Sequence, residues 1–331
     1  MAVGSNKTLV RMLVAGMVLA SALLLTASGR LVPVAKGPVV VMLGRGGAAN
    51  DAFYKAFRQT FTARHPFLAT QVRWVTLPLA DSREAHAHNL RRIAAEGVDL
   101  IVARNAAQAE LAHEVVPASS LLFWSHVDPR RIGVVAELTR PGGTATGLWV
   151  EDELDAKRIE LLLDAYPSVQ RIGLLVDRSW LESGAGLVPG LQAFARARNA
   201  QLELVSAATL EAAVDQVDGP AKAIEAWYLP RSVISADGSL AQRLSERGKV
   251  VVAAYTPDIE NGAHLSYAHD RTLVQPALAD LAARILQGEP AGSIPVQTLH
   301  RYQLAVRLSN DARLPPLNPA VVRRADLVLR P

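Results

Sequence analysis

Cysteine is absent from the 331 residues of the chain. A chain without cysteine can form no disulfide framework, no metal–thiolate site and no cysteine nucleophile. It also offers no cysteine for the lipid anchor of a bacterial lipoprotein. Stability and function must therefore come from packing and from other polar groups.

A dense basic run and a low-complexity tract are also missing. The formal net charge is +4, the arginines and lysines are scattered, and half of the residues are hydrophobic. This composition is typical of a globular protein and gives no indication of nucleic-acid binding. The length is sufficient for two domains, each with its own core.

No apolar run near the N-terminus comfortably reaches the length of a membrane span, which is about 20 residues. Lys7 and Arg11 precede an apolar run at 12–25, and the small residues Ala27, Ser28 and Gly29 follow it. This order predicts that residues 1–29 are a secretory signal peptide, cleaved after Gly29. The alternative is an uncleaved anchor. Both predict a periplasmic location for the folded part.

Short apolar runs alternate with helical patterns in both halves of the chain. We predict strands at 39–43, 72–77, 98–103, 121–124, 171–176, 202–205, 223–229, 250–254, 264–267 and 300–308. We predict helices at 52–64, 86–96, 106–113, 190–199, 210–217, 238–247 and 272–287, and a short one near the C-terminus. This alternation is typical of parallel sheets with helices on both faces.

The midpoint separates the two halves. A loop at Pro141, Gly142 and Gly143 cannot continue a helix or a central strand, and a short strand at 146–150 follows it. A helix is then predicted to begin near Glu151 and to end before Pro167. The acidic residues of its predicted first turn suit the positive end of a helix dipole: Glu151, Asp152, Glu153 and Asp155.

This midpoint resembles the ABC transporter substrate-binding family that includes the tryptophan-binding TrpX-like proteins. The residues that carry the resemblance are Asp128-Pro129, Arg140-Pro141-Gly142-Gly143, Thr146-Gly147 and the Lys-Arg-Ile-Glu-Leu-Leu run at 157–162. The resemblance covers about residues 38–330. It implies a type I periplasmic-binding-protein fold, with two Rossmann-like, doubly wound α/β domains, parallel sheets and a ligand cleft between them.

The resemblance also implies how the chain divides. The first lobe would contain residues 38–147 plus about 264–290, since the family returns the late strand and its helix to the first domain. The second lobe would contain residues 148–263 plus about 291–331.

Ligands of open α/β sheets bind beyond the carboxyl ends of the strands. The candidate ligand-binding residues there are Asn50, Asp51, Asn105, Ala106, Asp128, Asp177, Arg178, Arg231 and Tyr255, and the resemblance adds Tyr267. Trp124 and Tyr228 also end strands, where they either contact the ligand or pack the core.

Three positions depart from the family pattern. Asn105-Ala106 replaces the usual Gly-Thr, Asp177-Arg178 replaces Asn-Pro, and Arg231 stands where an acid often holds an ammonium group. The exchange of an acid for a cation argues against a plain amino acid as the ligand. It favours an anionic ligand, or a protein that serves signalling or scaffolding rather than uptake.

Other motifs have weaker interpretations. Gly44, Gly46 and Ala49 follow a strand, but the next strand does not end in the acid that a dinucleotide site needs, so we predict no cofactor. The glycine loop either offers N–H groups to an anion or is a tight turn.

Two histidine groups complete the list of candidates. His86 and His88 are two apart on a helix and are predicted to be surface residues rather than metal ligands. Ser266, His264, His269 and Asp270 include the residue types of a catalytic triad, but there is no Gly-x-Ser-x-Gly elbow. We therefore predict neither a metal site nor an enzyme.

The predicted function is that of a monomeric, periplasmic solute-binding component of an ABC uptake system. It would bind a small amino-acid-like or anionic ligand by hinge closure and present the closed form to an ABC permease in the inner membrane. The alternative is a sensory or interaction module of the same fold that partners a membrane signalling protein. An exported enzyme is disfavoured.

Overall fold

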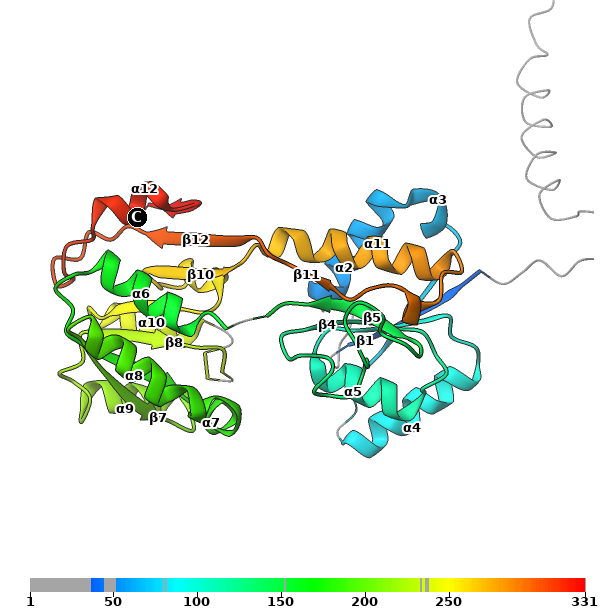
Figure 1. The fold of residues 1–331 in the computed structure, drawn as a ribbon, viewed down its shortest axis with the longest axis horizontal. Coiled ribbons are helices and arrows are strands. Elements are labelled where there is room, and N and C mark those ends of the chain that lie inside the picture. Colours follow the sequence, from blue (N-terminus) through cyan, green and yellow to red (C-terminus); the bar gives the residue numbers. More distant parts are fainter. Residues whose placement is uncertain are drawn as a thin grey trace, which may run out of the picture.

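The computed structural model describes residues 37–44, 52–78, 80, 82–151, 153–232, 234–235 and 238–330. These residues form two α/β lobes, each built around its own sheet, and the chain passes between the lobes three times (Figure 1). The predicted signal peptide, residues 1–29, lies outside the described residues. Among the helices that the structure describes, none combines the length and apolar character needed to cross a bilayer.

The first lobe, at the right in Figure 1, contains a six-stranded sheet in the order β11-β5-β4-β3-β1-β2. Its strands are β1 (Val39–Leu43), β2 (Arg73–Leu77), β3 (Leu100–Ala103), β4 (Leu121–Ser125), β5 (Ala145–Trp149) and β11 (Gln297–Thr298). All neighbouring strands are parallel. β1 and β3 are buried along their whole length, as continuous apolar runs in a doubly covered sheet must be.

Helices cover both faces of this sheet. They are α2 (Ala52–Arg64), α3 (Pro66–Ala69), α4 (Arg83–Ala95), α5 (Ala106–Val115) and α11 (Val274–Leu286). Phe57 and Phe61 of α2 pack with α11 into one core, and the core on the other face includes Leu90 of α4 and Ala109 of α5. The two cores sandwich the sheet and fix the positions of its strand ends.

The second lobe contains a seven-stranded sheet in the order β13-β12-β10-β9-β8-β6-β7. Its strands are β6 (Arg171–Val176), β7 (Gln201–Ser206), β8 (Ala226–Leu229), β9 (Val250–Ala253), β10 (Leu265–His269), β12 (Tyr302–Arg307) and β13 (Leu327–Leu329). Only β10 and β12 pair antiparallel among these described strands.

The helices of the second lobe again lie on both faces of the sheet. They are α6 (Asp155–Ala165), α7 (Arg178–Gly184), α8 (Val188–Ala197), α9 (Leu210–Asp218), α10 (Ser239–Glu246) and α12 (Pro319–Arg324). One core lies on the α6, α8 and α12 side and a second on the α9 and α10 side.

The predicted division of the late chain is wrong at two strands. The strand predicted at 264–267 does not return to the first sheet, because β10 pairs with β9 and β12 of the second sheet. Only the following helix, α11, packs on the first lobe. Conversely, β11 pairs with β5 of the first sheet, although 291–331 was assigned to the second lobe. Burial patterns show that a segment is covered, but they do not show which sheet has a free edge for it.

Two predictions about helices also need correction. The helix after the midpoint begins at Asp155, so Glu151 and Glu153 precede it and belong to the connection between the lobes. The short helix α7 was not predicted, because its sequence has no clear apolar periodicity.

Candidate ligand-binding cleft

Two cavities, of about 570 and 180 Å³, lie between the lobes and have Trp124, Tyr255, Arg271 and Val274 in common. The larger cavity is also lined by Ala52, Phe53, Ala56, Arg104, Asn105 and Gln275, and the smaller one by His126, Val150, Arg231 and His269. The lining comes from the carboxyl ends of β3, β4, β8 and β9, and from the N-terminal turns of α2 and α11. This is the edge at which ligands of open α/β sheets bind.

Aromatic rings from both lobes face this space. Phe53 and Trp124 of the first lobe stack with ring centroids 5.2 Å apart and planes only 4° from parallel. The ring of His126 lies 5.0 Å from Trp124, and Tyr255 approaches from the second lobe. These rings offer flat, apolar contact area for a ligand.

The cleft is also cationic. The guanidinium of Arg231 lies over the ring of Tyr255, 4.6 Å from its centroid. Arg271 lines both cavities, and burial together with the nearby charge of Arg231 lowers its pKa from the ordinary value. More than a third of the surface of Arg271 remains accessible, so this guanidinium stays charged and can reach a bound anion. Arg104 adds a third guanidinium to the lining.

Trp124 and Gln275 of the lining each have a buried polar atom without a hydrogen-bond partner among the described residues. The two atoms are the indole Nε1 of Trp124, a donor, and the amide Oε1 of Gln275, an acceptor. Buried polar atoms are normally paired, so each could be completed by a bound ligand or by water.

Three of the residues predicted as ligand-binding line the cleft: Asn105, Arg231 and Tyr255. Asn105 has a second role, because its side chain caps α5 by accepting a hydrogen bond from the backbone N–H of Gln108 at 2.9 Å. The side-chain oxygen of Asn105 is thus already engaged, and this leaves its amide NH₂ for a ligand. Asn50 and Asp51 lie outside the described residues.

Asp177 and Arg178 do not line the cavities. Asp177 is buried and caps α7, where it accepts hydrogen bonds from the backbone N–H groups of Trp180 at 2.9 Å and Ile234 at 3.1 Å. Arg178 is exposed and pairs with Glu182 one helical turn further on. Asp177 therefore joins two loops of the second lobe instead of facing a ligand.

Asp128, Ala106 and Tyr267 also lie outside the lining. Asp128 forms a two-pronged ion pair with Arg130, which lowers the pKa of that carboxyl. Ala106 begins α5. The ring of Tyr267 stacks on Tyr302 at 5.5 Å and packs against a core of the second lobe.

Trp124 and Tyr228, the two aromatic residues at strand ends, have different roles in the structure. Tyr228 is fully buried, and its hydroxyl donates to Asp155 and accepts from Arg158. It packs the core of the second lobe, whereas Trp124 is half-buried and lines both cavities. The sequence could not separate them, because both end apolar strands.

Several lining residues were not predicted. They are Phe53, Arg104, His126, His269, Arg271, Val274 and Gln275. Arg104 directly precedes Asn105 and could have been chosen by the same strand-end rule. Arg271 could not, because its place depends on where the chain leaves the second sheet.

The histidine motifs have structural roles. His86 is buried, contrary to the prediction that both histidines are surface residues, and accepts a hydrogen bond from the N–H of Ala80 at 3.3 Å. Burial lowers its pKa. His88 is exposed. No cluster of three or more potential metal ligands occurs among the described residues.

The two histidines and the aspartate of the candidate triad bond to other groups. His264 accepts from the N–H of Val251 at 3.1 Å, and His269 bonds to the carbonyl of Glu151. Asp270 caps the turn that leads into α11 through Thr272. In the glycine-loop motif only Gly44 is described, and its N–H donates to the carbonyl of Leu77.

The three connections between the lobes are tied to one another at the second lobe. His269 ends β10 and bonds to Glu151 in the connection from β5 to α6. Asp270 pairs with Arg301 at 3.3 Å, which joins the connection from β10 to α11 with that from β11 to β12. These contacts hold the three connections together beside the smaller cavity, which His269 also lines.

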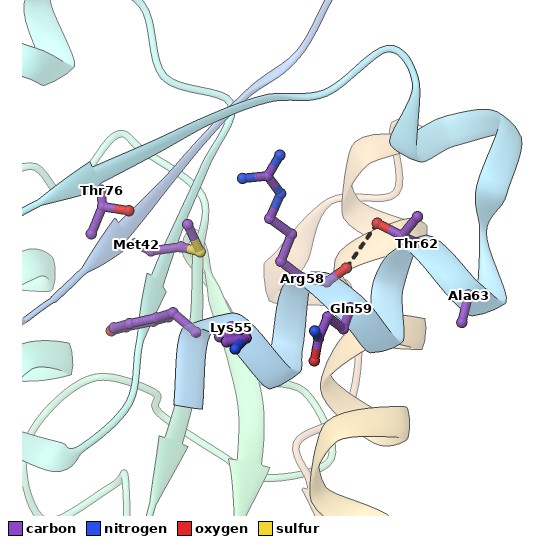
Figure 2. A pocket seen from close by; sticks show the side chains of 8 residues that line it. Met42, Lys55, Arg58, Gln59, Thr62, Ala63 and Thr76 are labelled. Atoms are coloured by element: carbon purple, nitrogen blue, oxygen red, sulfur yellow. Dashed lines mark hydrogen bonds between the residues drawn. The ribbon is translucent and has the colours of Figure 1, made fainter. Parts of the chain in front are cut away.

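A further cavity of about 480 Å³ lies away from the cleft, between α2 and the strands β1 and β2 (Figure 2). Met42 and Thr76 face it from the sheet, and Lys55, Arg58 and Thr62 face it from the helix. It is lined by the first lobe alone, so movement of the lobes would not close it.

Comparison with known proteins agrees with this geometry. A family described as "ABC transporter substrate binding protein" matches residues 71–315. A curated relative, the "Tyrosine-binding protein" of Clostridioides difficile strain R20291, is 23% identical over 210 residues, which are 63% of this chain and 60% of the relative. The match thus spans less than two thirds of that relative's length.

Solved structures show the same fold. A conserved domain protein from Vibrio cholerae has a TM-score of 0.72 at 21% identity, over 88% of this chain and 99% of that one. An ABC domain from Streptococcus pneumoniae in complex with L-Trp has a TM-score of 0.69 at 17% identity, over 89% of this chain and all of that one. The predicted two-lobed, type I periplasmic-binding-protein fold is confirmed.

Proposed function

We propose that this chain, which belongs to the ABC transporter substrate-binding protein family, is the exported solute-binding component of an uptake system. It binds a small, amino-acid-like or anionic ligand between its lobes and presents the closed form to a membrane permease. The observation that carries this proposal is the cleft, which residues of both lobes line. The family is one of substrate-binding proteins and not of enzymes.

Hinge closure follows from where the lining residues sit. A ligand that contacts Trp124 on one side and Tyr255 on the other gains more free energy when the lobes approach. It therefore shifts the population toward the closed form, by as much as its affinities for the two forms differ. The three connections allow this motion. The contacts of His269 and Asp270 keep the connections together where they meet the second lobe.

The chemistry of the lining supports a ligand with an anionic group and an apolar part. Arg231 and Arg271 can form charge-assisted hydrogen bonds with a carboxylate, and Phe53 and Trp124 can contact a ring. The names of the relatives mention tyrosine and L-Trp, both of which carry a carboxylate and an aromatic ring.

The test is a thermal-shift screen of the chain from Arg30 onward against amino acids, nucleosides and small anions. A binding compound should raise the melting temperature. It should also decrease the radius of gyration in X-ray scattering, because the lobes close. A screen in which no compound shifts the melting temperature would contradict the proposal.

Paired variants locate the site. Tyr255→Ala removes a lining ring from the second lobe and should weaken binding of any compound that the screen finds. Phe67→Ala removes a ring that is 82% exposed on α3, far from the lining, and should not. Equal effects of the two variants would place the ligand outside the cleft.

A further inference from the structure

The charges that line the cleft indicate which ligands fit it, and the inference below rests on the proposed function. An α-amino acid carries a carboxylate and an ammonium group side by side. A closed site must provide partners for both, because an unpaired buried charge is costly.

The lining provides well for the carboxylate. Arg104 and Arg271 line the larger cavity, and Arg231 and Arg271 line the smaller one. Arg231 and Arg271 both line the smaller cavity, where burial and the charge of Arg231 lower the pKa of Arg271. A carboxylate at this cavity can form charge-assisted hydrogen bonds with both guanidinium groups.

The lining provides poorly for an ammonium group. No aspartate or glutamate from the described residues lines either cavity. Asp258 acts electrostatically on Arg271, but it is buried and does not line the space. Among the lining side-chain acceptors, the oxygen of Asn105 is used by Gln108, and the Oε1 of Gln275 and the hydroxyl oxygen of Tyr255 are neutral groups.

The apolar part of the lining is aromatic. Phe53 and Trp124 of the first lobe form a parallel stack, and Tyr255 of the second lobe lines the same cavity together with Ala56 and Val274. The volume, about 570 Å³, lies in the usual range of small-molecule sites. The indole Nε1 of Trp124 adds one unpaired donor for an oxygen of the ligand.

We infer that the ligand is an aromatic carboxylate without an amino group, such as an arylpropionate or an arylacetate. Its carboxylate binds Arg231 and Arg271, and its ring lies among Phe53, Trp124 and Tyr255. The ligand thus has the ring and the carboxylate of an aromatic amino acid but lacks its ammonium group. The described lining offers no carboxylate with which an ammonium group could pair.

Matched pairs of compounds test this directly by calorimetry. We would titrate the chain from Arg30 onward with indole-3-propionate and L-tryptophan, and with 3-(4-hydroxyphenyl)propionate and L-tyrosine. Each deaminated acid should bind at least about ten-fold more tightly than its amino acid, because the ammonium group would be desolvated without a partner. Tryptamine, which has the cation without the acid, should show no binding.

An amino acid that binds as tightly as its deaminated partner would overturn the inference. Asp51 lies outside the described residues but is present in the protein under test. If its carboxylate pairs with the ammonium group of an amino acid, that amino acid should bind as tightly as its deaminated partner. Binding of only non-aromatic compounds would also overturn the inference and leave the proposed function intact. Binding of nothing in the wider screen would contradict the proposed function itself.

Charge variants separate the carboxylate contact from general effects. Arg271→Gln should weaken indole-3-propionate at least about ten-fold, because it removes a charge-assisted contact. Arg196→Gln changes the same residue type at an exposed position of α8, outside the lining, and should leave the affinity unchanged. Unchanged affinity in Arg271→Gln would exclude the assigned carboxylate position.

Discussion

The guanidinium of Arg231 lies 4.6 Å from the centroid of the Tyr255 ring, and both residues line the smaller cavity. They follow neighbouring strands, β8 and β9, so the sheet register holds them together. The stacking restrains the orientation of the guanidinium and thus prepares it for an anion.

Arg231→Ala should weaken indole-3-propionate by at least about ten-fold, because a charge-assisted contact is lost. Arg178→Ala should leave its affinity unchanged, since this side chain is 93% exposed and pairs with Glu182. Calorimetry on both variants measures the difference. Similar losses would show that net charge, and not position, governs binding.

Arg158 is a buried arginine whose removal should destabilise the second lobe strongly. It donates to the carbonyl of Tyr267 at 2.8 Å and to the hydroxyl of Tyr228 at 3.2 Å, and lies 3.6 Å from Asp155. Arg158→Met would leave the carboxylate of Asp155 without this cation, at a cost of roughly 3–5 kcal/mol in the free energy of unfolding. Urea denaturation followed by circular dichroism measures it.

Arg198→Met is the matched control. Arg198 also pairs with an acid, Asp164, at 2.6 Å, but this pair is partly exposed. Its loss should cost only about 0–1 kcal/mol. A loss below 1 kcal/mol in Arg158→Met as well would mean that the buried network adds little to stability.

Gly173 allows the close approach of a large ring. It lies opposite Trp227 in the pairing of β6 with β8, and a Cβ at Gly173 would come within 2.5 Å of the indole. Gly173→Ala should therefore destabilise the protein by about 1–3 kcal/mol through overpacking. Thermal or urea unfolding of the variant tests this.

Gly190→Ala serves as the comparison for the glycine variant. A Cβ at Gly190 would meet nothing within 4 Å, and the residue lies in α8. Alanine there should stabilise the helix by about 0.5–1 kcal/mol. If both glycine variants lower the free energy of unfolding, the contact with Trp227 is not the cause of the loss in Gly173→Ala.

His264 makes stability depend on pH. Burial lowers its pKa from 6.5 to about 4, so the folded protein holds this imidazole neutral while the unfolded chain protonates it. The unfolded state therefore binds more protons between these values, and stability falls as pH decreases from about 6.5 to about 4. The total loss is on the order of 3 kcal/mol.

Unfolding measured at several pH values should show this slope, and His264→Gln should reduce it. His88→Gln changes an exposed histidine and should keep the slope of the parent protein. An unaltered slope in His264→Gln would assign the acid sensitivity to other groups.

The sequence alone determined the local elements and the family. The continuous apolar run of β1, the periodic phenylalanines of α2 and the Pro-Gly-Gly loop at the midpoint each favour one local conformation. Gly147 shows why the midpoint motif is specific, because a Cβ there would come within 2.2 Å of the carbonyl oxygen of Phe123.

Only the tertiary structure decided which sheet β10 joins and which strand-end residues face the cleft. Asp177 and Arg231 both follow strands of the second sheet, yet one caps a helix and the other lines a cavity. Arg271 enters the cleft because the chain crosses to the first lobe after His269. Side-chain direction and strand pairing depend on distant partners, and a linear pattern does not contain that information.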